Sequence, residues 1–369
     1  MWQLVAGGLL SWVPLEAYGR YTVATGETAL HGFRTHLPGG RWLALIVLAG
    51  VVLGQWSGLP VLVGTVARLI HAGWQPAQSP VGEMAVAAVM LGGIYALLAI
   101  GRMAVLMLLV AGSVVLMAGA FLWALWIVGP APETLARGLV PSLSAAESGL
   151  RPVVALLGIA VAAPTFLARS LVVKSAGWAV ANAREQRRDA AFSALVMVVV
   201  AVSVLACAAG ALHPKSLPVR DVFEAARGLD QAAGRRAAEL FRLGALGAGV
   251  SSIIPIMVIL PLLIADYLGE EVRLRGSRFL ILTALAGVVG WSGALPGEHL
   301  IPFHRTASLV AQVFVLPTVV AGAFLLLNQS NLMCEHRAGF WLNAGLSLAF
   351  AFSLASSWLG LTGLWVRFG

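Results

Sequence analysis

The sequence predicts an all-α, polytopic integral membrane protein with about ten transmembrane helices in one transmembrane domain. Of its 369 residues, 59% are hydrophobic and 11% are charged, whereas a soluble domain carries roughly a quarter charged residues. Apolar runs of about 20 residues, the length that crosses a bilayer, recur along the chain. These runs lack the two-residue alternation of barrel strands, so the backbone hydrogen bonds are expected to be satisfied within helices.

The first five predicted spans are separated by polar segments. The segment 19–41 is polar enough to end the first span, and the joint at Gly101 and Arg102 leaves room only for a tight turn between two helices. The connection 129–149 is long enough for structure of its own. The five spans cover 2–18, 41–70, 83–100, 103–128 and 150–172.

The last five predicted spans follow one long amphipathic segment and several short loops. The segment 213–239 mixes both signs of charge with apolar residues, so it is expected to form a surface helix rather than a span. Pro255 and Pro261 predict an irregular interior for the seventh span, because each proline removes a helical hydrogen bond. The five spans cover 189–212, 240–267, 278–296, 307–327 and 339–364.

The net charge of +8 comes from basic residues that stand singly or in small groups between the spans. Nucleic-acid-binding domains instead gather Lys and Arg along one face, so no nucleic acid partner is expected. The loops on the side of 19–41 carry more Lys and Arg than the alternate loops, which predicts a cytoplasmic 19–41 and an external amino terminus. The expected location is the cell (inner or plasma) membrane, with the lipid bilayer as partner.

A proline lies near the middle of the fifth predicted span, within a run of small residues. Pro164 lacks a backbone N–H donor and clashes with the preceding turn, so the carbonyl groups before it are free to face a cavity. Discontinuous helices of this kind form ion and substrate sites in transporters. Ala163, Pro164 and Thr165 are therefore candidate ligands of a small transported ion. The alternative is a proline kink packed against neighbouring helices.

Four further polar side chains lie inside predicted spans, where each needs a partner. Gln55 lies in the second span and Gln312 in the ninth, five residues before Pro317. An amide at such a position either binds a cation or joins two helices. Ser251 and Ser252 lie in the seventh span, and their hydroxyl groups either line a site or bond to a carbonyl of their own helix.

Motifs of the common enzyme classes are missing from the sequence. It contains no nucleophile elbow, no phosphate-binding glycine loop, no HExxH and no pair of membrane carboxylates. These motifs place the nucleophiles, phosphate cradles and metal ligands of hydrolases and nucleotide-binding enzymes. The sequence therefore predicts neither an enzyme nor a resident cofactor.

Four segments spaced along the whole chain carry a family resemblance. They cover 16–30, 162–173, 249–252, and 331–337 together with 341–343. In this order and spacing they resemble the Nramp family of divalent-metal transporters, whose fold is similar to that of LeuT-like carriers. The resemblance implies an inverted-repeat bundle of eleven helices, in which this chain begins at the second helix.

The resemblance also implies which residues meet the metal ion. The family's first helix supplies an Asp-Pro-Gly-Asn type break, and its sixth helix carries Met-Pro-His where this chain has Ala163, Pro164 and Thr165. Gln55 stands near the place where the family's third helix carries acidic residues for proton transfer. Without the thioether, carbonyl and hydroxyl oxygens would hold the cation, which suits a harder ion such as Mg²⁺ or Mn²⁺.

Three functional hypotheses follow from these observations. The first is a secondary transporter that moves a small cation, most plausibly a divalent metal ion, by alternating access at the broken helix. The second is a non-transporting relative that retains the scaffold as a membrane interaction or sensor protein, since the family's ligands are replaced. The third is a carrier of a small organic substrate, because small residues at the break leave room for a larger ligand.

Overall fold

The computed structural model describes residues 1–74, 79–140, 162–211, 221–270, 275–296 and 300–368. Throughout these ranges the regular elements are helices, and none is a strand. Seven helices are long and apolar enough to cross a membrane by length and composition, and an eighth candidate combines Val313–Asn328 with Ser330–His336, bent by 66°. The predicted class, an all-α polytopic membrane protein, is thereby confirmed.

The helices occupy the predicted apolar runs, and shorter helices lie between them. The α-helices are α1 Trp2–Thr25, α2 Ala29–His36, α3 Gly40–Trp74, α4 Pro80–Ile100, α5 Met103–Val128, α6 Pro132–Leu139, α8 Ala163–Ser175, α9 Ala183–Ala211, α10 Val222–Ala233, α11 Arg235–Leu268, α12 Ser277–Trp291, α13 Leu300–Asn328, α14 Ser330–Met333 and α15 Phe340–Phe368. Three 3-10 turns are η1 Val180–Asn182, η3 Ser292–Ala294 and η4 Cys334–His336. The amphipathic helix expected within 213–239 is α10.

Local residue chemistry sets several helix ends. Ser79 caps α4 by accepting a hydrogen bond from the Gly82 N–H at 3.3 Å, and Pro80 occupies the first turn, where its missing N–H is not needed. Gly101 ends α4 at φ 80°, a left-handed conformation that suits glycine. Arg102 then begins α5 at once, so the two helices form the tight hairpin that the sequence predicts.

Two features of the helices differ from the sequence-based expectations. The segment 19–41, expected to be a loop, contains α2 and the last turns of α1. The prediction of an irregular seventh span is wrong, because α11 is one continuous helix that includes Pro255 and Pro261. Helix α11 packs along both α3 and α5, and this burial offsets the hydrogen bonds that the prolines remove.

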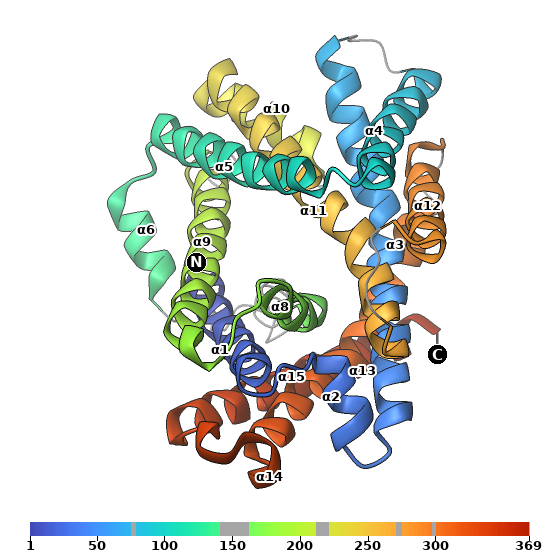
Figure 1. Ribbon diagram of the computed structural model, residues 1–369. Coiled ribbons are helices and arrows are strands. Elements are labelled where there is room, and N and C mark those ends of the chain that lie inside the picture. Colours follow the sequence, from blue (N-terminus) through green and yellow to red (C-terminus); the bar gives the residue numbers. More distant parts are fainter. Residues whose placement is uncertain (75–78, 141–161, 212–220, 271–274, 297–299, 369) are drawn as a thin grey trace.

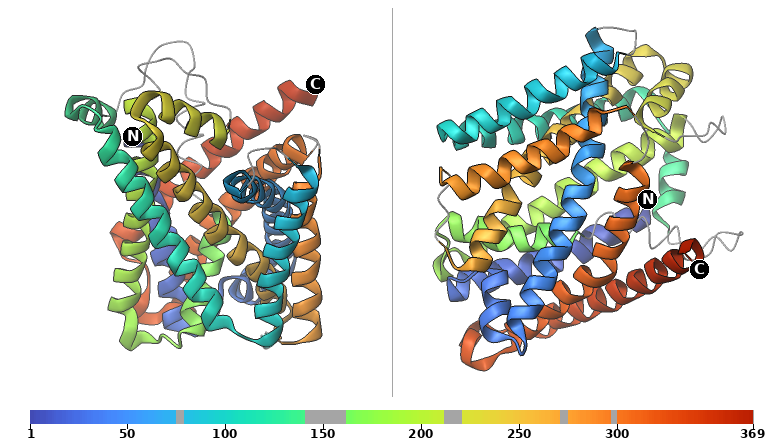
Figure 2. Two further views of the ribbon diagram at one scale, coloured as in Figure 1. Left: turned by 90° about the horizontal axis from the view of Figure 1, so that it is seen from above. Right: turned by 90° about the vertical axis from the view of Figure 1, so that its right-hand side faces the viewer.

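Helix α8 lies near the centre of the bundle, as Figure 1 shows, within a ring that includes α1, α9, α5, α11, α3 and α13. It contacts α1, α2, α11 and α13 directly. Figure 2 shows that the two chain ends lie at the same end of the bundle as α10. This arrangement agrees with the predicted topology, in which both termini and 213–239 share one side of the membrane.

Three clusters of buried side chains hold the bundle together. The largest joins α1, α2, α3, α8, α13 and α15 and includes Tyr18, Phe33 and Phe166. A second cluster joins α3, α4, α5, α11 and α12 around Ile253 and Met257. A third joins α5 and α9 to α10 and α11. Because α8 belongs to the first cluster, its position depends on α1 and α13 more than on the outer helices.

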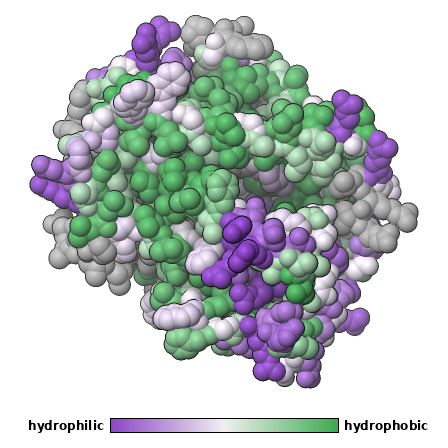
Figure 3. Space-filling model, turned by 60° about the vertical axis from the view of Figure 1, so that its left-hand side comes forward, coloured by the Kyte–Doolittle hydropathy of each residue, from purple (hydrophilic) through white to green (hydrophobic). Residues whose placement is uncertain are grey.

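The outer surface of the bundle is apolar. Leu108, Val115 and Trp126 of α5 are exposed, as are large apolar side chains of α4, α9 and α12. Figure 3 shows a broad hydrophobic area on one face of the molecule. An apolar surface of this extent would promote aggregation in water but suits contact with lipid acyl chains. The protein is therefore a multi-pass membrane protein.

Close backbone contact between α3 and η3 supplies a test of this packing. A Cβ atom added at Gly64 would lie 2.2 Å from the carbonyl oxygen of Gly293, whereas one added at Gly112 of α5 would meet no atom within 4 Å. We expect Gly64→Ala to lower the free energy of unfolding by ~1–3 kcal/mol through overpacking. The control Gly112→Ala is expected to leave it unchanged or raise it. Thermal unfolding in detergent measures the stability of both variants. Equal effects of the two substitutions would contradict the close contact between α3 and η3.

Candidate functional site

Helix α8 begins at the proline motif singled out in the sequence. Ala162 has extended backbone angles, φ −112° and ψ 109°, and the Thr165 N–H donates to the Ala162 carbonyl at 3.0 Å. Pro164 stands in the first turn, where a proline fits without loss of a helical bond. The first part of the predicted fifth span, 150–161, lies outside the described residues. The chain is thus non-helical directly before Ala163, and α8 lies inside the ring of surrounding helices (Figure 1).

The start of α8 presents both apolar and polar groups. Ala163 is buried in the largest core cluster, Pro164 is half-buried and Thr165 is exposed. The positive end of the helix dipole lies here and disfavours a cation close to the amide groups. A cation at this break therefore needs oxygen ligands such as the Thr165 hydroxyl and the peptide carbonyls that precede the helix.

Two polar side chains anchor the other half of α8. Arg169, 7% exposed, forms an ion pair with Asp189 of α9 and donates to the Gln186 carbonyl at 2.9 Å. Ser170 accepts a hydrogen bond from the Ala29 N–H of α2 at 3.0 Å. These bonds fix the second half of α8 to two neighbouring helices. Arg169 therefore has a structural role within the bundle.

Helix α2 ties the ends of two long helices together next to α8. Thr28, at the start of α2, donates to the Asp266 carboxylate of α11 at 2.5 Å. Arg34 of α2 donates to the Tyr267 carbonyl, also on α11. Thr28 and Asp266 are both buried. The sequence alone does not reveal this pair, because the two residues lie 238 residues apart.

Glu27 is the centre of a second polar cluster on this side. It accepts hydrogen bonds from the Tyr21 hydroxyl at 2.7 Å and from His36 at 2.8 Å, and His31 lies 3.9 Å away. Burial opposes the charge of Glu27, but the bonds from Tyr21 and His36 and the nearby imidazoles outweigh it and hold its pKa below the ordinary value. Gln329 donates to the His36 carbonyl at 3.0 Å and extends the cluster to α14.

The two serines of α11 adopt the structural alternative that the sequence left open. The hydroxyl groups of Ser251 and Ser252 both donate to the Ala248 carbonyl, at 3.0 Å and 2.8 Å. Gly249 lies against Val66 of α3 at this level, so the serines belong to a close helix contact. Their hydroxyl oxygens retain acceptor capacity.

The two glutamines lie on helices that pack against each other. Gln55 of α3 is half-buried. Gln312 lies in α13, and its side chain is outside the described part of the chain. Gly50 of α3 rests against Val315 of α13, so both glutamines stand near one helix crossing. The candidate residues thus lie on four helices, α3, α8, α11 and α13, of which α3 contacts α11 and α13, and α8 contacts α11 and α13.

The described ranges contain no cluster of the side chains that most often bind metal ions in proteins. No three His, Cys, Asp or Glu side chains there are grouped so that they could hold a metal ion. Carbonyl, amide and hydroxyl oxygens, such as those near the start of α8, prefer hard cations.

Many secondary transporters contain discontinuous helices that are packed among membrane-length helices in this way. The chain belongs to the Nramp family, since the model of the Natural resistance-associated macrophage protein-like family matches residues 1–362. No curated protein sequence matches the chain.

Solved structures of a manganese transporter from Eremococcus coleocola share the fold. One single-site mutant has a TM-score of 0.77 at 15% sequence identity, covering 98% of this chain and 79% of that chain. The complex with an aromatic bis-isothiourea substituted compound has a TM-score of 0.76 at 13% identity, covering 96% and 78%. At these identities the likeness establishes the fold alone.

The Arg169 anchor leads to a stability prediction. We expect Arg169→Met to lower the free energy of unfolding by ~1–3 kcal/mol, because the Gln186 carbonyl loses its donor while the half-exposed Asp189 remains solvated. The control Arg137→Met removes a fully solvated pair with Glu133 and is expected to change little. Thermal unfolding in detergent compares the two variants with the wild type. Equal changes in melting temperature would contradict a stabilising role of Arg169.

The lowered pKa of Glu27 leads to a pH prediction. A lowered pKa means that the Glu27 carboxylate stabilises the fold above its ordinary pKa of about 4.3, and that this contribution is lost as the pH falls through the lower folded value. The difference in melting temperature between wild type and Glu27→Gln should therefore be present at pH 7, shrink as the pH falls below the ordinary pKa of a glutamate and vanish once the pH lies below the lowered pKa of the folded protein. Glu133→Gln, at an exposed site, should show no such difference, and a constant Glu27→Gln effect across pH would contradict the assignment.

Proposed function

We propose that the chain is a secondary transporter that moves a divalent metal cation across the membrane by alternating access at the break before α8. The observation that carries the proposal is the start of α8 at Ala163 in the middle of the bundle. Membership of the Nramp family supports it, as does the shared fold with a protein named as a manganese transporter. The metal ion is cargo, and the proposal assigns no chemical reaction to the chain.

The contacts of α8 suggest which parts move together. Arg169 and Ser170 attach the second half of α8 to α9 and α2, so these helices move with it. Helix α2 is also attached to the end of α11 by Thr28 and Asp266. Opening the side predicted to be cytoplasmic requires these bonds to break or the attached helices to move as one body. The cation passes at the other end of α8.

Oxygen ligands determine which cations fit the proposed site. The Thr165 hydroxyl and peptide carbonyls are hard ligands, and Ala163 contributes no thioether. Such a set favours Mn²⁺ or Mg²⁺ over the softer Cd²⁺. Gln55 and Gln312 are proposed to face the path because their helices cross beside it. Ser251 and Ser252 are the weakest candidates, since their hydroxyl protons are already donated to Ala248.

Metal uptake into liposomes tests the proposal. Liposomes that contain the protein and a Mn²⁺-sensitive dye should take up Mn²⁺ faster than protein-free liposomes. Thr165→Val removes one oxygen ligand at nearly constant volume, and we expect about a tenfold loss of uptake at low Mn²⁺, equivalent to ~1.4 kcal/mol. Thr362→Val is the matched control, because the Thr362 hydroxyl donates to the Leu359 carbonyl near the end of α15.

Competition by other solutes distinguishes the remaining alternatives. Stronger inhibition of Mn²⁺ uptake by Mg²⁺ than by Cd²⁺ would support the oxygen-ligand site, and the reverse order would contradict it. Uptake of an amino acid in place of metal ions would support an organic-substrate carrier. Folded protein without any uptake would overturn the transport proposal and favour a non-transporting scaffold.

A further inference from the structure

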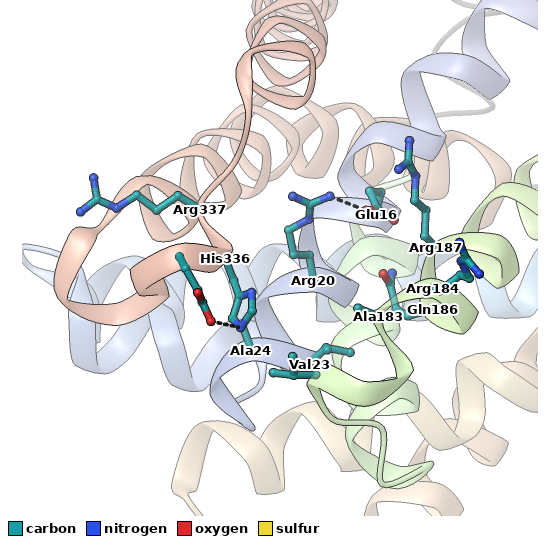
Figure 4. A pocket seen from close by; sticks show the side chains of 12 residues that line it. Glu16, Arg20, Val23, Ala24, Ala183, Arg184, Gln186, Arg187, His336 and Arg337 are labelled. Atoms are coloured by element: carbon teal, nitrogen blue, oxygen red, sulfur yellow. Dashed lines mark hydrogen bonds and ion pairs between the residues drawn. The ribbon is translucent and has the colours of Figure 1, made fainter.

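A cavity lies on the outer side of the bundle, away from the start of α8. It is enclosed by the second half of α1, the start of α9 and the turn η4, and has a volume of about 380 Å³. Figure 4 shows side chains from these three elements around the cavity, with Arg337 extending away from the others. By the predicted topology, this end of the bundle is cytoplasmic.

Positive charge dominates this cavity. Four arginines line it, with only Glu16 and Glu335 as acidic residues. Arg20 is paired with Glu16 at 3.0 Å, and Glu335 lies 3.9 Å from His336. Within the described ranges no carboxylate lies at ion-pair distance from the other three arginines, which are exposed. They are Arg184, Arg187 and Arg337.

Two buried N–H groups beside this charge lack acceptors. Gln186, 1% exposed, lines the cavity, and no described group accepts from its Nε2. Gly19 of α1 makes room for this amide, because an added Cβ would lie 1.8 Å from Nε2. The indole N–H of Trp12 is likewise buried and unpaired. A buried donor without an acceptor is unfavourable, and a bound oxygen-rich anion would remove this cost.

One carboxylate oxygen of Glu16, which lines the same cavity, also lacks a hydrogen-bond donor among the described residues. Oxygen Oε1 of Glu16 accepts from Arg20, whereas Oε2 is buried and, among the described residues, has no partner. An anion without a hydroxyl group, such as sulfate, offers this oxygen no donor. A phosphodiester that carries a neighbouring hydroxyl group satisfies the arginines and the amide with its phosphate oxygens and Glu16 with its hydroxyl.

A second, smaller cavity continues the first one along the helices. Its volume is about 110 Å³, and it shares Glu16, Arg20 and Arg187 with the larger cavity. The remaining lining is largely apolar and consists of Trp12, Val13, Trp341 and Leu342. Trp341 is 85% exposed next to exposed Phe340, an aromatic pair typical of the membrane–water interface. Figure 3 shows a hydrophilic patch directly beside the hydrophobic surface on this side.

We propose that the two cavities form a binding site for an anionic phospholipid whose headgroup carries a hydroxyl group, such as phosphatidylglycerol. The phosphate lies among Arg184, Arg187 and Gln186, and the headgroup hydroxyl donates to Glu16. The glycerol backbone passes Trp12 toward the acyl region. Basic pockets at the cytoplasmic ends of membrane helices bind anionic headgroups in this way. The site lies away from the start of α8 and does not depend on metal transport.

Native mass spectrometry of the detergent-purified full chain tests this site. Wild-type protein should retain phosphatidylglycerol at least about tenfold more tightly than phosphatidylcholine. Arg184→Gln with Arg187→Gln should abolish this preference. The matched control, Arg41→Gln with Arg102→Gln, makes the same charge change at exposed arginines outside both cavities and should retain it. Equal loss in both double variants would overturn the proposal.

Two further experiments test the role of the buried Gln186 amide and ask whether the bound phosphate belongs to a lipid or to a soluble anion. Gln186→Leu should weaken phosphatidylglycerol retention without lowering the melting temperature of lipid-free protein, because the amide nitrogen has no acceptor within the described chain. Glycerol phosphate and inorganic phosphate at millimolar concentration should fail to displace the lipid. Displacement by either soluble anion, or equal retention of both lipids, would refute a lipid site.

Discussion

The satisfaction of backbone hydrogen bonds in hydrocarbon is the constraint on which this structure depends. A continuous helix meets it without help, and most of the long helices do so with apolar side chains toward lipid. Helix α8 does not, because it begins at Ala163 in the middle of the bundle. Its free end is tolerated only because other helices surround it, so the ring around α8 is a requirement for the break (Figure 1).

The two halves of α8 have different surroundings, and this difference gives the helix its proposed role. Its second half is held by the buried Arg169 and by Ser170, which connect it to α9 and α2. Its first turn carries the exposed Thr165 beside non-helical backbone. A helix that is rigidly attached at one end and open at the other can present oxygen ligands to a cation while it moves with its neighbours.

Two groups of polar and charged residues lie at the end of the bundle predicted to be cytoplasmic, and they serve different structural purposes. Around α2, Thr28, Asp266 and Glu27 connect helix ends through hydrogen bonds that lie largely within the protein. On the outer side, Arg184 and Arg187 remain free of protein partners within the described ranges and border apolar surface. The first group closes the bundle, whereas the second faces the lipid–water boundary, where free positive charge attracts anionic headgroups.

The sequence by itself determined the apolar helices, the hairpin at Gly101 and the break at Pro164, because chain hydropathy, glycine conformation and the missing proline N–H act locally. It indicated α10 from amphipathicity but missed α2, which is too short to show a clear period. It also predicted a disrupted α11, which packing against α3 and α5 keeps continuous. Only the tertiary structure decided the pairing of Thr28 with Asp266 and the burial of Gln186 against Gly19. Those contacts join residues far apart in the chain, and helix packing rather than local propensity brings them together.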